Sequence, residues 1–103
     1  MAEYYLKVDN IMKNMFVVAL KDELAAQAEQ GNVQEQTEEL LAKVCTYDLQ
    51  EKRLPITSEE QHQIRNALNR LRNKYLAMGR TSGGIDKIIM RVLKPNTSKH
   101  FFW

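Results

Sequence analysis

The segment Pro55–Gly84, PITSEEQHQIRNALNRLRNKYLAMGRTSGG, decides the fold because it carries the strongest helix signals in the chain. Thr57 can cap a helix, and Glu60 three residues later completes a capping box. Gly79 supplies the left-handed backbone at which helices commonly end. The segment therefore predicts a long helix from Thr57 to Gly79. Its apolar residues recur at alternating spacings of four and three, the pattern of a seam that faces a partner helix: Ile64, Leu68, Leu71, Tyr75 and Met78, broadened by Ala67 and Leu76.

The start of the chain predicts a first helix that begins between Ala2 and Asp9 and runs to about Gln30. Apolar residues recur there at spacings of three and four, which is typical of one buried helix face. They are Tyr5, Val8, Met12, Met15 and Ala19, with Ile11, Val18 and Leu20 widening the stripe. Gly31-Asn32 then ends the helix.

A second helix is predicted over Val33–Gln50. Asn32 with Glu35 three residues later matches a capping box, and more acids follow in the first two turns. Cys45 lies beside the apolar side of this helix, so we expect its thiol to be a small buried side chain. Glu51–Ile56 forms the connection to the third helix, and Pro55 within it prevents the second helix from continuing.

A short fourth helix follows the flexible turn Arg80–Gly84 and stops at Pro95; its apolar residues are Ile85, Ile88, Ile89 and Val92. Four helices with short connections predict an all-α protein, an antiparallel four-helix bundle. The chain of 103 residues fits one such domain over residues 1–95, with a loose, basic and aromatic tail over 96–103. No internal repeat stands out.

Several classes of function find no support in the sequence. The longest apolar run, Met15–Leu20, is far shorter than the roughly 18 residues of a membrane span. The opening MAEYYLKVDN lacks the apolar core of a secretory signal, and the single cysteine excludes an internal disulfide, so we expect a cytoplasmic protein. His62 and His100 have no metal-binding neighbour at a suitable spacing. We therefore expect no metal, no cofactor, no catalytic residue, no small-molecule substrate and hence no enzyme.

Charge divides the chain into two halves of opposite sign, because residues 1–51 carry −6 and residues 52–103 carry +8. Arg65, Asn69 and Arg72 form one stripe along the third predicted helix, and Arg70 and Lys74 form a second beside it. Such rows can follow a phosphate backbone, which would make this helix a nucleic-acid-binding surface. Alternatively, these residues form a solvated face that pairs with the acidic first half.

The end of the chain places large aromatic side chains beside basic ones. The residues are Lys99, His100, Phe101, Phe102 and Trp103. They can fold back into a groove of the bundle. Otherwise they are an exposed anchor for a protein partner or for the interface of a membrane.

The segment Leu54–Gly83 resembles the enterocin A-type immunity proteins of pediocin-like bacteriocins. The residues that carry the resemblance are Ile56-Thr57, Glu60-Gln61, Ile64, Leu68 and the turn Gly79-Arg80-Thr81-Ser82-Gly83. The resemblance implies a cytoplasmic four-helix bundle that protects a bacteriocin producer without catalysing a reaction. It implies action at the membrane-embedded mannose phosphotransferase permease that serves as the bacteriocin receptor, with the C-terminal half carrying specificity. Arg80 and Lys99–Trp103 would then form the contact surface.

Two classes of function therefore remain open at the level of sequence. One is an immunity protein that faces a complex of permease and bacteriocin, peripheral to the inner membrane face. The other is a small nucleic-acid-binding or phage-type regulatory protein. The seam on the third helix can pair within one chain or between two, so a homodimer is possible in either class.

Overall fold

A computed structural model describes residues 4–51, 53–94 and 96–97. Its elements follow in the order β1 (Tyr4–Leu6), α1 (Asn10–Glu29), α2 (Glu35–Thr46), β2 (Leu54–Ile56), α3 (Ser58–Ala77), α4 (Gly83–Leu93) and β3 (Asn96–Thr97). A single 3-10 turn, Leu49–Glu51, lies between α2 and β2. The strands form one antiparallel sheet in the order β2-β1-β3.

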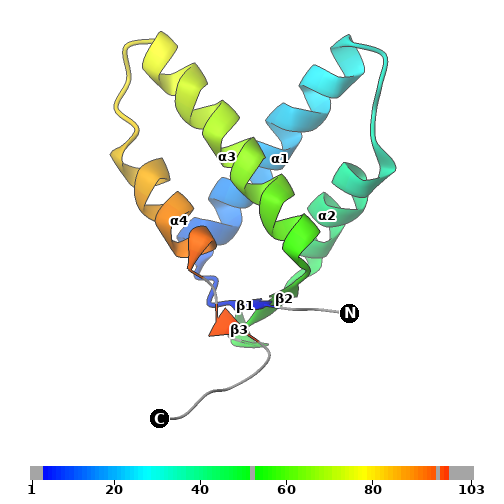
Figure 1. Cartoon of the computed structure of the whole chain (residues 1–103), viewed down its shortest axis with the longest axis vertical. Coiled ribbons are helices and arrows are strands. Elements are labelled where there is room, and N and C mark those ends of the chain that lie inside the picture. Colours follow the sequence, from blue (N-terminus) through cyan, green and yellow to red (C-terminus); the bar gives the residue numbers. More distant parts are fainter. Residues whose placement is uncertain (1–3, 52, 95, 98–103) are drawn as a thin grey trace.

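The two long helices, α1 and α3, cross each other and diverge away from the sheet (Figure 1). The short helices α2 and α4 lie on opposite sides of this crossing. The main helix contacts join α1 to α3, α1 to α2, and α3 to α4. Over the described residues the prediction of a mostly helical protein with four packed helices is therefore confirmed.

The small sheet was not predicted from the sequence. Leu6 and Val8 are buried while Lys7 between them is exposed, which is the period of a strand. The same residues continue the spacing of the following helix, so the pattern read as one long helix. In the structure α1 begins only at Asn10, because the carboxylate of Asp9 accepts the Met12 backbone N–H at 2.8 Å and caps it. The helix therefore begins one residue beyond the late limit of the predicted range, and Tyr5, predicted for its apolar stripe, belongs to a strand.

The second helix is shorter than predicted at both ends. The backbone N–H of Asn32 donates to the carbonyl of Gln27 at 2.8 Å, which closes the end of α1 around Gly31 at φ +67°. Asn32 therefore does not cap α2; Gln34 holds the N-cap position without a side-chain cap bond. At the other end Tyr47 adopts an extended backbone, so α2 stops well before Gln50.

The third helix follows the prediction closely. The hydroxyl of Thr57 accepts the Glu60 N–H at 3.0 Å, and the Glu60 carboxylate accepts the Thr57 N–H at 2.9 Å, so the capping box is present. Gly79 has φ +74° just beyond the end of the helix, as expected. The predicted stop holds, but α4 already begins at Gly83, inside the predicted turn.

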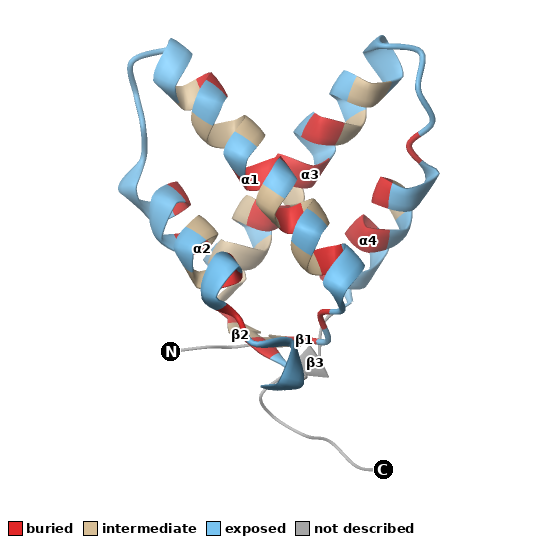
Figure 2. Ribbon diagram, turned by 180° about the vertical axis from the view of Figure 1, so that it is seen from behind, coloured by how far each residue is buried: buried red, intermediate tan, exposed pale blue. Residues whose placement is uncertain are grey.

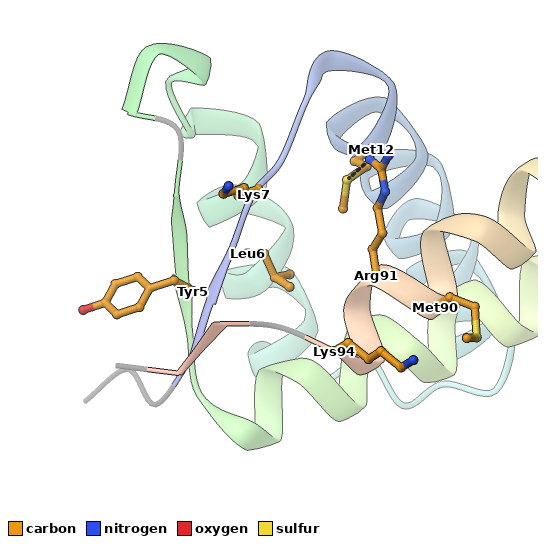
Figure 3. Close-up of a pocket in the computed structure, with 7 residues that line it drawn as sticks. All are labelled: Tyr5, Leu6, Lys7, Met12, Met90, Arg91 and Lys94. Carbon is orange, nitrogen blue, oxygen red and sulfur yellow. Dashed lines mark hydrogen bonds between the residues drawn. The ribbon is translucent and has the colours of Figure 1, made fainter. Parts of the chain in front are cut away.

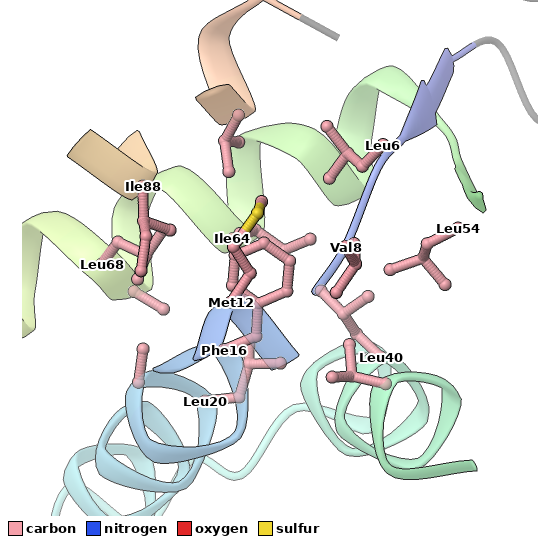
Figure 4. Packing of buried hydrophobic residues seen from close by; sticks show 14 of the residues in the cluster. Leu6, Val8, Met12, Phe16, Leu20, Leu40, Leu54, Ile64, Leu68 and Ile88 are labelled. Atoms are coloured by element: carbon pink, nitrogen blue, oxygen red, sulfur yellow. The ribbon is translucent and has the colours of Figure 1, made fainter. Parts of the chain in front are cut away.

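The core is one cluster that runs from the sheet through the helix crossing (Figures 2 and 4). Its largest fully buried members are Phe16, Leu6, Met12, Leu20, Leu40, Leu54, Ile56, Ile64, Leu68 and Ile85. Four residues predicted for the apolar stripes of the first and third helices are exposed instead: Ile11, Val18, Leu76 and Met78. Crossed helices contact each other over a shorter length than aligned ones, so stripe residues away from the crossing stay in solvent. Cys45, expected inside, is also exposed.

The structure contains an internal repeat that was not recognised in the sequence. Each unit consists of a strand, a helix of 20 residues, a glycine with positive φ and a shorter helix. A residue of the second unit lies 48 positions after its equivalent in the first. Identical pairs at this offset include Leu6 and Leu54, Ala19 and Ala67, Leu20 and Leu68, Gly31 and Gly79, and Val44 and Val92. Most aligned positions differ, which explains why the repeat escaped notice.

The two units are related by an approximate two-fold axis. In the sheet, Leu6 of β1 lies opposite its own equivalent, Leu54 of β2. An antiparallel pair centred on equivalent residues is symmetric about that point. β3 breaks the symmetry, because Asn96 and Thr97, which the sequence placed in a loose tail, pair with β1. The rest of the predicted tail, residues 98–103, lies outside the described residues.

Tyr47 joins the end of α2 to the start of α1. Its carbonyl accepts a hydrogen bond from Lys13 Nζ at 2.9 Å, and its ring is buried in the core. Its hydroxyl is buried without a hydrogen-bond partner among the described residues. Burial raises the pKa of the Tyr47 hydroxyl, and the nearby carboxylates of Glu51 and Asp48 raise this pKa further.

Tyr47→Phe removes this unpartnered hydroxyl, so we expect the free energy of unfolding at pH 7 to stay level or rise by up to about 1 kcal/mol. Because the pKa is raised on folding, the neutral hydroxyl contributes its stability below the unfolded pKa of about 10 and loses it as pH rises through the folded value. The wild type should therefore lose stability relative to Tyr47→Phe above pH 10, by at most about 1.4 kcal/mol per pH unit. Urea unfolding of both proteins between pH 8 and 11 measures this difference in the free energy of unfolding. Equal losses of stability in the wild type and in Tyr47→Phe would contradict the prediction.

Candidate anion-binding groove

The basic stripes predicted on the third helix are largely neutralised within the molecule. Arg70 and Lys74 both contact the Asp22 carboxylate on α1, at 3.3 and 2.9 Å. Arg72 pairs with Asp86 of α4, whose carboxylate also accepts the Ser82 hydroxyl at 3.0 Å. Of the five residues predicted for nucleic-acid binding, only Arg65 and Asn69 have no ion pair or hydrogen bond from their side chains within the described part of the chain. Most of this basic face therefore pairs with acidic residues inside the molecule, as the second interpretation of the sequence expected.

The other predicted contact residue, Arg80, lies at the far end of α3. Its guanidinium lies 4.8 Å from the centre of the Tyr75 ring, and its backbone N–H donates to the Tyr75 carbonyl at 2.9 Å. The side chain is exposed. The structure does not test whether Arg80 adjoins the tail aromatics, because Lys99–Trp103 lie outside the described residues.

The structure instead brings basic residues together at the sheet end of the molecule. A cavity of about 600 Å³ lies between β1 and α4 (Figure 3). Its lining consists of Tyr5, Leu6, Lys7, Met12, Met90, Arg91 and Lys94. A second cavity of about 570 Å³ shares Lys7 and Arg91 with the first. The rest of its lining is Val8, Asp9, Asn10, Leu49 and Arg53. Because the two cavities share walls, we treat them as one feature, the basic groove.

Local sequence explains how these side chains reach the groove. On α4 the apolar residues that face the core leave Lys87, Arg91 and Lys94 exposed at spacings of four and three. These three cations therefore follow one side of the helix. Lys7 is exposed because its neighbours in the strand turn inward. Figure 3 shows Leu6 directed away from the outer side of the sheet, on which Tyr5 lies.

The lining residues of the basic groove leave an excess of positive charge. Lys7, Arg53 and Lys94 form no ion pair within the described residues. The one acid among the lining residues is Asp9, whose carboxylate already accepts the Met12 N–H and Arg91 Nη1, the latter at 3.3 Å. Both partners of that ion pair are more than half exposed, so the pair is weak. The groove therefore offers several cations to an anion from solution.

At the position related by the two-fold axis, the cation equivalent to Arg91 is ion-paired. There Lys43, the equivalent of Arg91, forms an ion pair at 2.9 Å with Glu60. The equivalent of Glu60 is Met12, which offers Arg91 only a thioether sulfur at 3.3 Å. Arg91 therefore lacks the carboxylate on the first turn of the neighbouring long helix that its counterpart possesses. On one side of the two-fold axis lies the Lys43–Glu60 ion pair, and on the other side lies the basic groove.

Sequence reasoning missed this groove, although one signal for it was present. The spacing of Lys87, Arg91 and Lys94 marked a basic side of the predicted fourth helix. The contribution of Lys7 could not be seen, because it required β1 to be recognised as a strand. Arg53 joins the groove only through the sheet pairing that follows it.

Within residues 4–51, 53–94 and 96–97, no cluster of His, Cys, Asp and Glu has a geometry that could hold a metal ion. None of the helices in this part of the chain combines the length and apolar character that crossing a bilayer requires.

Comparison of the chain with protein-family models, with curated proteins and with solved structures gave no match.

Proposed function

We propose that this protein binds nucleic acid through phosphate contacts in the basic groove. The observation that carries the proposal is the set of cations Lys7, Arg53 and Lys94, unpaired among the described residues, around an Arg91 that is only weakly paired. Free cations that share one concave surface are what a phosphate backbone requires, because they neutralise successive charges and release counterions. The groove replaces the third helix as the proposed site, since most cations of that helix are already paired.

The number of cations sets the expected strength of binding. If Lys7, Arg53, Arg91 and Lys94 each neutralise one phosphate, log K should fall against log salt concentration with a slope of roughly −3 to −4. Such a count supports weak, sequence-independent binding, with a Kd on the order of 10⁻⁴ to 10⁻⁶ M at physiological salt. Sequence-specific recognition would need contacts to base edges in addition.

Met90→Glu tests the site without disturbing the core. Met90 lines the groove and is 53% exposed, whereas Met78, at the end of α3, is 57% exposed and outside the groove. Met78→Glu is therefore a control with the same change of charge and a similar exposure. At about 50 mM salt we expect Met90→Glu to weaken oligonucleotide binding roughly tenfold, the loss of about one phosphate contact.

Fluorescence anisotropy of a labelled oligonucleotide, titrated at several salt concentrations, measures the effect of both substitutions. The oligonucleotide affinity of Met78→Glu should stay within about twofold of the wild-type value, because this substitution changes only the net charge of the protein. Equal weakening by both variants would place binding outside the groove. Absence of salt-dependent binding by the wild type would contradict the proposed function.

A second proposal follows from the resemblance of Leu54–Gly83 to bacteriocin immunity proteins. The observation that favours it is the exposed Arg80, held over Tyr75 at a turn far from the basic groove and available to a protein partner. We expect the chain, produced in a bacteriocin-sensitive strain, to raise survival, and Arg80→Ala to reduce that protection. Lys21→Ala, which removes an exposed cation from α1, is the control.

The survival assay also tests the tail. Deletion of Lys99–Trp103 should reduce protection if these residues belong to the contact surface; unchanged protection would remove them from it. A wild-type chain that gives no protection at all would reject the immunity proposal.

A further inference from the structure

We propose that the basic groove accepts a single-stranded nucleic acid, with one unpaired base placed in the cavity between β1 and α4. This inference rests on the proposed function and adds the form of the nucleic acid to it. Three features of the described residues carry it: the one-sided distribution of cations, the apolar floor of the cavity and the free donors of Arg91.

The cations of the groove come from both units of the repeat, Lys7 from the first and Arg53, Arg91 and Lys94 from the second, but they gather on one side of the two-fold axis. The equivalent of Lys7 is Pro55, and the equivalent of Lys94 is Thr46. Lys43, which corresponds to Arg91, is held by Glu60. A two-fold protein that grips both strands of a duplex needs cations on both sides of its axis. Here one side alone supplies them, so the molecule offers a track for one phosphate backbone.

The cavity between β1 and α4 has an apolar floor beneath its basic rim. Leu6 and Met12 are buried there, and Met90 borders the opening. A duplex keeps its bases stacked inside and presents phosphates and sugars outward, so it leaves this floor uncovered. An unpaired base has an apolar face that can cover it, and methionine sulfur makes favourable contacts with aromatic rings. The volume of about 600 Å³ is in the range of pockets that enclose small organic ligands.

Arg91 connects the apolar floor to the basic rim. Both hydrogen bonds of its side chain leave from Nη1, one to Asp9 and one to the sulfur of Met12. Within the described residues Nη2 and Nε have no partner, and together they form the fork that binds two phosphate oxygens at once. A phosphate held there lies directly beside the cavity, which is where the base of the same nucleotide would enter.

The experiment compares single-stranded and duplex oligonucleotides of equal length in anisotropy titrations with the full chain. We expect the single strand to bind about tenfold more tightly than the duplex at about 100 mM salt, because stacking of one base contributes about that much to the affinity. Met90→Ala should weaken binding of the single strand about fivefold and leave the salt slope unchanged, because it removes an apolar contact and no charge. Met78→Ala, equally exposed but outside the groove, is the matched control and should have no effect.

Arg91→Gln separates the charge contact from the base contact. It should weaken the single strand and lower the salt slope by about 0.7, the contribution of one phosphate on a single strand. Circular dichroism and thermal unfolding confirm that each variant is folded; because Arg91 and Met90 are both exposed, these substitutions leave the core intact.

The outcomes separate the two proposals. Duplex binding as tight as single-strand binding, or a Met90→Ala variant that binds the single strand normally, would overturn the single-strand inference while phosphate binding stands. A polyglutamate peptide that competes as well as the oligonucleotide would also overturn it, since the groove would then recognise negative charge alone. If neither nucleic acid binds in a salt-dependent manner, the proposed function fails as well.

Discussion

The antiparallel pairing of β1 with β2 is the interaction on which the rest of the structure depends. Leu6 and Leu54 meet at its centre, both buried, and each strand leads within a few residues to the N-cap of a long helix, Asp9 or Thr57. Because the strands are antiparallel, they lead to helix starts on opposite sides of the sheet, and α1 and α3 converge, cross and then diverge (Figure 1). The small side chains of Ala19 and Ala67, both buried at equivalent positions, suit the close approach of crossed helices. The short helices then cover the flanks.

Function is proposed where the two units of the repeat differ. On one side of the two-fold axis Glu60 neutralises Lys43, whereas on the other side Met12 leaves Arg91 with a weak, exposed partner. The acidic first half and basic second half meet through pairs such as Asp22 with Arg70 and Lys74, which consume much of the charge that the sequence displays. Among the cations without an ion pair in the described residues, Lys7, Arg53 and Lys94 line the basic groove. The charge asymmetry of the sequence therefore indicated a basic surface on the third helix, where most of the predicted cations are ion-paired in the structure.

Local signals predicted a large part of the fold, and tertiary contacts decided the remainder. The capping box at Thr57 and the glycines at 31 and 79 act within a few residues, so the end of α1 and both ends of α3 could be predicted from the sequence. Strands of three residues or fewer give too little alternation to be distinguished from a helix stripe, which hid β1. The basic groove was beyond sequence reasoning because Lys7, Arg53 and Arg91 come from three segments that only the sheet brings together.

The most direct test of the account is an NMR titration of the isotope-labelled chain with a short single-stranded oligonucleotide. The account predicts that the backbone amides of Lys7, Arg91 and Lys94 shift first, together with the side-chain signals of Met90, while those of the third helix around Asn69 and Lys74 stay in place. Shifts confined to the third helix, with the groove unaffected, would contradict it.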